Sequence, residues 1–329
     1  MKNLSLLTVM HLLVDGVCGA VLAIYAIKES HLEPIIFYFG LYTIFAFGLQ
    51  GPVGWLLDKD PTYNKKAIVA STLLLALGTI PQLTIGMQTI LLGLGNCLFH
   101  VVGGSYVLRK YSTYSELGLF VSSGAIGLGL GLYGIISVWP LLALACLFTG
   151  LAVKNMQELT REDLTFSANV SDENSPNKLL GIVALLFGCI VLRGFGSGNV
   201  LESSFIMLLP CTFALGKLLG GFVCDKIGYK KTVLLILLIG FVGLKIQGLY
   251  GGLLFVLSSN MTMPLTLRLA HWCRIGAPGL MFGLAASCLV PGTIFKDLIS
   301  LPPQLILVLQ FLILVIAGFA LLKKEYQYG

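Results

Sequence analysis

The strongest constraint in this sequence is a series of apolar runs, each long enough to cross a bilayer, that recurs from one end of the chain to the other. A hydrocarbon core of about 30 Å needs about 20 apolar residues in a helix. Hydrophobic residues make up 57% of the 329 residues and charged residues 11%, and the mean hydropathy is +0.92. In lipid a helix satisfies its own backbone hydrogen bonds. The runs therefore predict an all-α polytopic membrane protein.

We predict twelve membrane spans, separated by turn signals and by charged loops. They cover residues 4–27, 35–57, 67–84, 88–108, 117–137, 139–153, 179–199, 203–224, 232–248, 251–269, 277–296 and 302–322. The first run is too long for the core of a signal peptide, so we interpret it as a retained helix. The polar stretch 154–178 divides the series in two. The sequence thus predicts two pseudo-symmetric six-helix bundles, at residues 1–153 and 179–329, with a cytoplasmic linker between them.

The distribution of Lys and Arg predicts the orientation in the membrane. With the N-terminus inside the cell, sixteen basic residues fall on the cytoplasmic side, four fall on the opposite side, and Lys217 lies within a span. Cytoplasmic loops carry an excess of Lys and Arg in membrane proteins. We therefore expect a protein of the cytoplasmic membrane with both termini in the cytoplasm. The net charge of +6 reflects this topology and does not indicate a nucleic-acid partner.

Two charged turns, one in each half, share a signature. Gly221-Phe-Val-Cys-Asp225-Lys226-Ile-Gly228-Tyr-Lys230-Lys231 separates two apolar runs. Gly54-Trp-Leu-Leu-Asp58-Lys59, followed by Lys65-Lys66, holds the corresponding place in the first half without the closing glycine. Such turns lie at a membrane face, because charged residues are expensive in hydrocarbon. Two copies at matching positions indicate a duplicated bundle.

We expect these turns to act as gating loops. Asp58 is predicted to face the N-terminus of the span that begins near Pro278, and Asp225 to face the start of the fifth span. A carboxylate at a helix N-terminus is stabilised by about 0.3–1 kcal/mol. Such contacts would hold the two halves together in one state and break in another. The predicted gating residues are Gly54, Asp58, Lys59, Gly221, Asp225, Lys226, Gly228, Lys230 and Lys231.

Polar residues inside the spans recur every third helix. They are His11 and Asp15 in the first span, Asn96 and His100 in the fourth, Arg193 in the seventh and Asn260 in the tenth. Intramembrane ionisable residues are functional by default, so we predict that these six line a central cavity. The structural alternatives are an intrahelical pair of His11 with Asp15, interhelical hydrogen bonds of the two Asn, and snorkelling of Arg193. Lys217 is expected to snorkel to the cytoplasmic face.

The turn at Gly221–Lys231 resembles the loop between helices 2 and 3, and its repeat between 8 and 9, of major facilitator superfamily (MFS) transporters. This resemblance implies that helices 1, 4, 7 and 10 line the cavity and that helices 3, 6, 9 and 12 face lipid. Over residues 8–135 the chain is similar to the fosmidomycin-resistance type of exporter. The residues that carry this similarity are His11 and Asp15, then Gln50, Gly54, Asp58, Lys59 and Pro61, then Gly93, Gly95, Phe99 and His100, and the spaced glycines Gly124, Gly127 and Gly131. The chain departs from the family's motifs at Thr89, Val101, Val102 and Leu132.

The function predicted from these features is secondary transport of a small organic solute by alternating access, favouring proton-coupled export. Asp15 and His100 would carry protons, and Arg193 would contact an anion. The sequence contains no G-x-x-x-x-G-K-[ST] motif for ATP, so we expect a gradient-driven, monomeric protein in the lipid bilayer. We expect no enzymatic activity, cofactor or metal. The alternatives are uptake or facilitated diffusion, a non-transporting receptor or scaffold, and a metalloenzyme using His11, Asp15 and His100.

Overall fold

The computed structural model describes residues 2–28, 32–156, 176–196, 207–274, 276–295 and 298–322, and these residues are helical with no strand among them. The first half contains α1 (Lys2–Lys28), α2 (Leu32–Thr43), a π-helical turn η1 (Ile44–Gly48), α3 (Gln50–Lys59), a short 3₁₀ turn η2 (Pro61–Tyr63), α4 (Asn64–Gly78), α5 (Ile85–Lys110), α6 (Tyr114–Leu132) and α7 (Val138–Asn155). The second half contains α9 (Pro176–Gly196), α10 (Leu208–Ile227), α11 (Tyr229–Lys245), α12 (Leu249–Cys273), α13 (Pro278–Ser287), α14 (Leu289–Phe295) and α15 (Pro303–Leu322).

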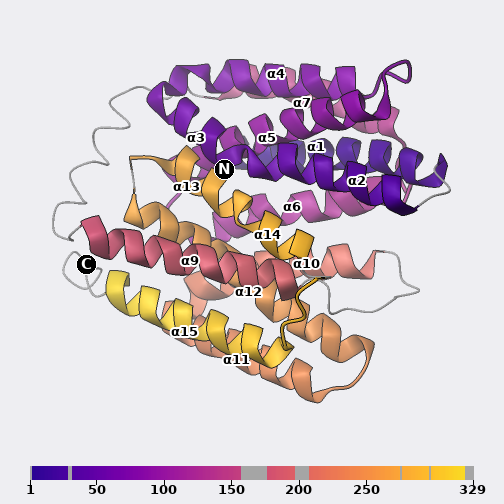
Figure 1. Ribbon diagram of the computed structural model, residues 1–329. Coiled ribbons are helices and arrows are strands. Elements are labelled where there is room, and N and C mark those ends of the chain that lie inside the picture. The colour runs from indigo at the N-terminus through magenta and orange to yellow at the C-terminus, as the bar shows by residue number, and fades with distance from the viewer. Residues whose placement is uncertain are drawn as a thin grey trace.

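The described helices form twelve rods, because α2 continues through η1 into α3, and α13 continues into α14. Helices α1–α7 pack together as one six-rod bundle and α9–α15 as a second one beside it (Figure 1). The predicted fold class is confirmed: the described chain is all-α and forms two six-helix bundles. The predicted linker falls almost entirely on residues 157–175, which lie outside the described residues.

The helices extend further than the predicted spans at many of their ends. Helix α11, for example, begins at Tyr229 rather than at residue 232, and α12 runs on to Cys273. Their polar end residues stay helical because a helix can continue into the membrane interface. By length and composition, ten of the described rods can cross a membrane. The other two, α4 and α11, have 15 and 17 residues.

Four of the rods present apolar stripes to the outside. On α15 the exposed side chains Val308, Leu312, Ile316 and Phe319 follow one another at helical spacing. Exposed apolar residues also mark α4 (Val69, Leu73, Leu77), α7 (Leu144, Leu147, Leu151) and α11 (Leu234, Leu238, Phe241). A broad apolar flank of this kind suits lipid. These are the third, sixth, ninth and twelfth rods, which the resemblance to MFS transporters implied would face lipid.

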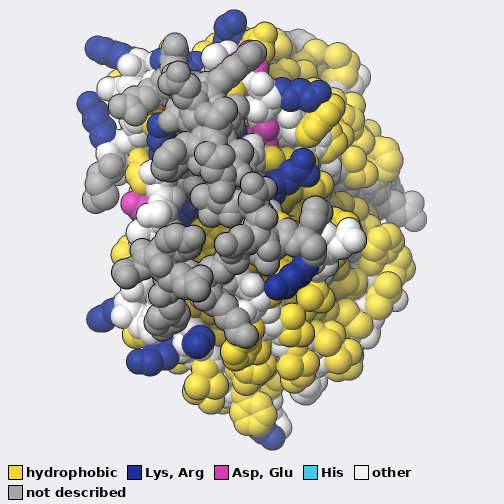
Figure 2. Space-filling model, turned by 90° about the vertical axis from the view of Figure 1, so that its left-hand side faces the viewer, with side chains coloured by type: hydrophobic (Ala, Val, Ile, Leu, Met, Phe, Trp, Pro, Cys, Tyr) yellow, Lys and Arg dark blue, Asp and Glu magenta, His cyan; other side chains and the backbone are white. Residues whose placement is uncertain are grey.

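Two pairs of helices make most of the contact between the bundles. Helix α3 packs against α13, and α10 packs against α6, so each contact unites one rod from either half. At one end of the molecule, here called the basic end, lie the turns after α3 and α10, with Lys59, Lys65, Lys66, Lys226, Lys230 and Lys231. Figure 2 looks onto this end and shows Lys and Arg side chains spread over it, with a hydrophobic flank beside them.

Helix α6 is the central element of the contact between the halves. On one side it packs against α1, where the Leu12 carbonyl leaves no room for a side chain at Gly127. On the other side it packs against α10, where Gly118 lies against the Lys217 backbone. The glycines of α6 thus allow close packing on both of its sides. This packing brings the polar residues of α1 next to the boundary between the two bundles.

Candidate functional site

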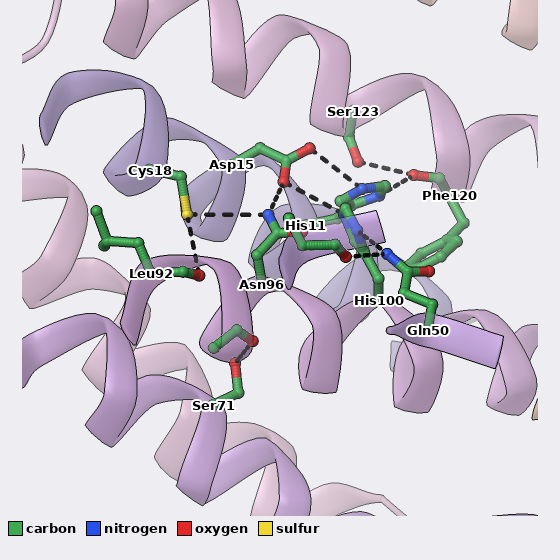
Figure 3. A network of polar contacts seen from close by, with 12 residues as sticks. His11, Asp15, Cys18, Gln50, Ser71, Leu92, Asn96, His100, Phe120 and Ser123 are labelled. Carbon is green, nitrogen blue, oxygen red and sulfur yellow. Dashed lines mark hydrogen bonds and ion pairs between the residues drawn. The ribbon is translucent and has the colours of Figure 1, made fainter. Parts of the chain in front are cut away.

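A buried carboxylate between two imidazoles forms the centre of the site. Asp15 and His11 lie one turn apart on α1, and His100 comes from α5 (Figure 3). The Asp15 Oδ2 atom lies 3.4 Å from His11 Nε2, and Asp15 Oδ1 lies 3.2 Å from His100 Nε2. Asn96 on α5 donates to Asp15 Oδ1 at 2.6 Å. All four side chains are buried, with at most 8% of each residue exposed.

The second nitrogen of each imidazole fixes where its proton lies. His11 Nδ1 is 2.7 Å from the Phe120 carbonyl oxygen, which can only accept, so Nδ1 carries a proton. In the neutral ring His11 Nε2 is then an acceptor that faces the Asp15 carboxylate. Two acceptors in contact repel each other unless a proton lies between them. The geometry therefore fits one proton bound at the contact of His11 with Asp15.

Gln50 orients His100. Its Nε2 group donates to the Ala46 carbonyl oxygen at 2.7 Å, which fixes the orientation of the amide. The same group lies 3.1 Å from His100 Nδ1, which must therefore accept. In the neutral ring the proton is then on Nε2, facing Asp15. This contact was not expected from the sequence, in which Gln50 is one residue of a motif at the end of the second span.

The π-helical turn η1 explains how Gln50 reaches this position. Residues Ile44–Gly48 depart from the α-helical hydrogen-bond pattern, and such turns frequently occur at functional sites. The freed carbonyls receive side chains: Gln50 binds Ala46, and Ser287 Oγ on α13 donates to Phe47 at 2.9 Å and to Gly48 at 3.2 Å. The turn thus connects the buried carboxylate site to the opposite bundle.

A cavity of about 350 Å³ opens on this site between the two bundles. Asp15, His11, His100 and Gln50 form its polar wall, and Lys217 on α10 lies in the wall as well. The remaining lining is mainly apolar and includes Phe47, Phe213, Met263, Phe282 and Leu289. A volume of this size fits a small organic molecule.

The cavity lies on the side away from the basic end. Helix α6 starts at the basic end, yet its lining residues begin only at Val121 and continue to Tyr133 beyond its other end. Helix α10 runs in the opposite direction, and its lining residues extend from Leu209 near its start to Lys217 in its middle. The space is therefore open toward the far end and closed toward the basic end.

The site residues predicted from sequence are only partly brought together. His11, Asp15 and His100 line the cavity, and Asn96 contacts Asp15 from behind. Arg193 and Asn260 are not among the residues that line this cavity. The Asn260 amide donates to Val256 on its own helix at 2.9 Å, and its Cβ packs toward Gly216 of α10. No described residue of α9 is part of the lining of this cavity, so for α9 the lining by every third helix stays a prediction, while α6, α10 and α13 supply residues that were not expected.

The expectation for Lys217 is also wrong. It was expected to extend to the cytoplasmic face, but it lines the cavity instead. Its backbone packs against Gly118 of α6. This contact places Lys217 at the boundary between the two bundles. Its position within a span was the sequence signal that could have identified it.

His11, Asp15 and His100 also have the composition of a metal site. Their potential ligand atoms all lie within 4.8 Å of one another, and two imidazoles with a carboxylate suit several divalent metals. His11 fits this role, because a metal-binding imidazole usually donates its other N–H to an oxygen. His100 does not fit, because Gln50 donates to its Nδ1 and leaves the proton on the nitrogen that would bind the metal. The site therefore fits a proton better than a metal ion.

At the basic end, Asp58 binds the first turn of a helix in the other bundle. Its Oδ1 accepts from the Gly279 amide at 2.9 Å and its Oδ2 from the Leu280 amide at 2.7 Å. Arg109 Nη2, from α5 of the same bundle, adds an ion pair at 2.6 Å. Gly54 allows the approach, because a Cβ there would overlap the Gly279 backbone. We call this contact of Asp58 with α13 the first latch.

Asp225 makes the corresponding contact in the reverse direction. Its two oxygens accept from the Tyr114 amide at 3.0 Å and from the Ser115 amide at 2.7 Å, at the start of α6. A Cβ on Gly221 would overlap the Tyr114 backbone, so glycine is needed here as well. We call this contact the second latch. Both contacts were predicted from the sequence and are confirmed.

The other residues of the two turns have local roles. Gly228 has a φ of +84° between α10 and α11, which glycine adopts without strain. The Lys59 ammonium lies 3.4 Å from the centre of the Trp55 ring, and that of Lys230 lies 5.8 Å from the Phe319 ring. Lys226 and Lys231 are exposed.

Arg268 provides a further link between the bundles that was not expected from the sequence. It lies on α12 with 1% of its surface exposed. In the sequence it is one of the sixteen basic residues on the predicted cytoplasmic side. Its Nη2 donates to the Thr113 carbonyl at 2.9 Å and its Nη1 to that of Leu108 at 3.4 Å. A buried Arg that reaches across the boundary adds to the closure of the basic end.

The comparisons with known proteins rest on structure. No protein-family model matches the chain, and neither does any curated protein sequence. A variant of the E. coli fucose:proton symporter FucP superimposes with a TM-score of 0.66 at 13% identity, covering 96% of this chain and 98% of that one. FucP in the outward conformation, described as an MFS transporter, gives 0.67 at 15% identity and covers 95% and 98%. A bacterial homologue of the iron transporter ferroportin in an outward-facing state gives 0.54 at 14% and covers 98% and 99%. At these identities the likeness concerns the fold.

Proposed function

We propose that this protein is a secondary transporter that moves a small organic solute across the cytoplasmic membrane by alternating access. The observation that carries the proposal is the cavity between the bundles, with Asp15, His11 and His100 on its wall and the two latches closing the basic end. In MFS folds the solute site lies at the interface of the two repeats, which rock about it. The protein in this state presents its cavity to one side only.

The orientation follows from the basic residues. Lys and Arg are concentrated at the basic end, which we place in the cytoplasm according to the positive-inside rule. The described starts of α1 and α9 and the end of α15 lie toward this side (Figure 1), in keeping with termini and a linker in the cytoplasm. The cavity then opens outward. The two outward-facing structures with the same fold support this assignment.

Proton coupling is the favoured energy source. The contact of His11 Nε2 with Asp15 Oδ2 is repulsive without a proton and favourable with one, so binding and release of a proton change the charge of the cavity wall. His100, held by Gln50, shares the same carboxylate. We infer that Asp15 with His11 is the proton-binding pair and that His100 stabilises its ionised form. Asn96 positions Asp15 by donating to Oδ1.

The two latches would act as the cytoplasmic gate. Asp58 and Asp225 each bind a helix start of the opposite bundle, so rocking toward the inward-open state must break both contacts. Gly54 and Gly221 would set the distance of closest approach. Lys59, Lys226, Gly228, Lys230 and Lys231 shape the turns that present the two carboxylates.

Export is the favoured direction, because the first half resembles exporters of the fosmidomycin-resistance type. Uptake is the alternative within the same fold, since FucP is described as a fucose:proton symporter. A receptor or scaffold would bind a ligand without flux. The direction of transport is determined by adding the solute to one side of the membrane at a time and recording from which side it moves protons.

The proposal is tested in proteoliposomes that contain a pH-sensitive dye. A library of small organic solutes, including fosmidomycin, is added, and the luminal pH is recorded. We expect at least one solute to move protons with the wild type, and Asp15→Asn to abolish this response. Asp60→Asn, which removes a loop carboxylate that binds Thr62, is the matched control and retains it. Proton movement that persists in Asp15→Asn excludes Asp15 as the coupling group. Ligand binding without flux in the wild type favours the receptor.

A further inference from the structure

Lys217 is the one described cation in the wall of the cavity. It lies eight residues before Asp225 on α10, which is about 12 Å along the helix axis and well inside the span. Within the described part of the chain, no group lies at hydrogen-bond or ion-pair distance from its ammonium. An ammonium placed in this way needs a counter-charge or water, because an unpaired charge in a membrane protein is costly.

A second cation lies within electrostatic reach of Lys217. Arg193, in the last turn of α9, is 5% exposed, and its buried Nη1 atom has no hydrogen-bond partner among the described residues. Arg193 and Lys217 are close enough to interact electrostatically. Two neighbouring positive charges in one bundle raise the potential on that side of the cavity. Because like charges repel, it is unfavourable for Lys217 and Arg193 both to stay charged unless an anion is nearby.

Among its described residues, the second bundle offers these two cations no free acid. Its only acidic residue within 176–196, 207–274, 276–295 and 298–322 is Asp225, which is engaged with α6 in the second latch. Across the cavity, Asp15 attracts Lys217 electrostatically but already contacts His11, His100 and Asn96. The positive charge of this wall therefore lacks a dedicated partner among the described residues.

We propose that Lys217 is the binding residue for the anionic group of the transported solute, with Arg193 reinforcing the positive potential around it. This inference rests on the proposed transport function and adds the substrate class: a small organic anion with an apolar body. Phe213, one turn before Lys217 on α10, and the lining residues Phe47, Met263 and Phe282 provide the apolar surface for that body. The volume of about 350 Å³ limits the solute to a small molecule.

The test uses matched probes with one phenyl body and different head groups. They are 4-phenylbutyrate, a phenylalkyl sulfonate and a phenylalkyl phosphonate as anions, 4-phenylbutyramide as the neutral probe, and 4-phenylbutylamine as the cation. Binding to purified full-length protein in detergent is measured by titration calorimetry and thermal shift at millimolar ligand. We expect at least one anion to bind saturably and to stabilise the protein, and the amide and amine to bind at least about tenfold more weakly, since a charged partner is worth at least 1.4 kcal/mol.

Two variants at Lys217 separate binding from folding. Lys217→Met keeps the length and removes the charge, and we expect it to lose the anion at least about tenfold while its ligand-free Tm stays equal or rises. Lys217→Arg keeps the charge, so it should retain anion binding within a few-fold. A ligand-free Tm that falls in Lys217→Met, with anion affinity unchanged, would show a structural role and overturn the proposal. Equal binding of the anions and the amide, or no anion binding at all, overturns it too.

These outcomes are independent of the transport test. The binding assay needs no flux and no proton gradient. If the wild type moves protons with a neutral solute and ignores every anion, the anion site is rejected while proton-coupled transport stands. If anions bind through Lys217 but no solute moves protons, the transport proposal fails and the anion site remains.

Discussion

Replacing Asp225 by Asn is the sharpest test of the gate, because the second latch consists of two hydrogen bonds to one carboxylate. The oxygens accept from the Tyr114 and Ser115 amides at 3.0 and 2.7 Å, and the next amide, Glu116, is capped by Thr113. The first four amides of a helix have no partner within it. Asp225 thus completes the N-terminal cap of α6 from the opposite bundle.

The expected magnitude follows from this geometry. A hydrogen bond to a charged group contributes about 1.5–3 kcal/mol, and a carboxylate at a helix N-terminus gains about 0.3–1 kcal/mol more. Asn keeps one acceptor oxygen and loses the charge, and because Asp225 is exposed the loss is about 1–2 kcal/mol, as for other helix-capping contacts. This shifts the equilibrium toward the inward-open state by about 5- to 30-fold.

The shift is measurable as a distance between spin labels at the basic end. Tyr63 and Ile227 are both exposed, lie in the two turns of the opposite bundles, and can be replaced by Cys after the exposed Cys146 and Cys211 are changed to Ser. Pulsed electron paramagnetic resonance should show a longer distance gaining population in Asp225→Asn. Glu116→Gln, whose carboxylate accepts from the amide and the hydroxyl of Thr113 in its own bundle, is the matched control. An unchanged distance distribution in Asp225→Asn would refute the latch.

Two glycine substitutions extend these tests, each with Gly150→Ala as control, because no heavy atom lies within 4 Å of a Cβ at Gly150. Gly221→Ala places a Cβ against the Tyr114 backbone, so it should separate α10 from α6 and increase the same longer spin-label distance; a wild-type distribution would contradict this packing. Gly124→Ala places a Cβ against Asp15 Oδ2 and His11 Nε2, so solute-driven proton movement in proteoliposomes should fall at least about tenfold while the protein stays folded. If Gly124→Ala moves protons as fast as the wild type does, the coupling proton does not bind at the contact of His11 with Asp15.

The parts of the fold that follow local rules could be predicted from the sequence. Twelve apolar runs define twelve rods because each must satisfy its own backbone in lipid. The two latch contacts were predictable because a carboxylate that ends one helix seeks the free amides that begin another. His11 and Asp15 were expected on one face because they are four residues apart.

The parts that depend on packing between the bundles could not be predicted. The π-helical turn at Ile44–Gly48 is satisfied by Gln50 and by Ser287, which lies 239 residues from Gly48 in the chain. Lys217 was expected to extend to the cytoplasmic interface, because it lies only two turns from Asp225. That distance does not show which face of α10 carries Lys217, and this face lines the cavity. Asn260 was expected in the cavity, although its face of α12 packs toward α10. The spacing of residues in the sequence gives the depth of a side chain in the membrane, but it does not give the direction in which that side of the helix faces.

Both latches bind main-chain amides, and this has a consequence for how the halves recognise each other. Asp58 and Asp225 make their cross-bundle bonds to the backbone of Gly279, Leu280, Tyr114 and Ser115, and not to their side chains. At Leu280, Tyr114 and Ser115 any residue except proline presents such an amide, whereas a Cβ at Gly279 would overlap the Gly54 backbone and the Asp58 carboxylate. The start of α6 is therefore free to change in composition without loss of the second latch, and the start of α13 must keep its glycine.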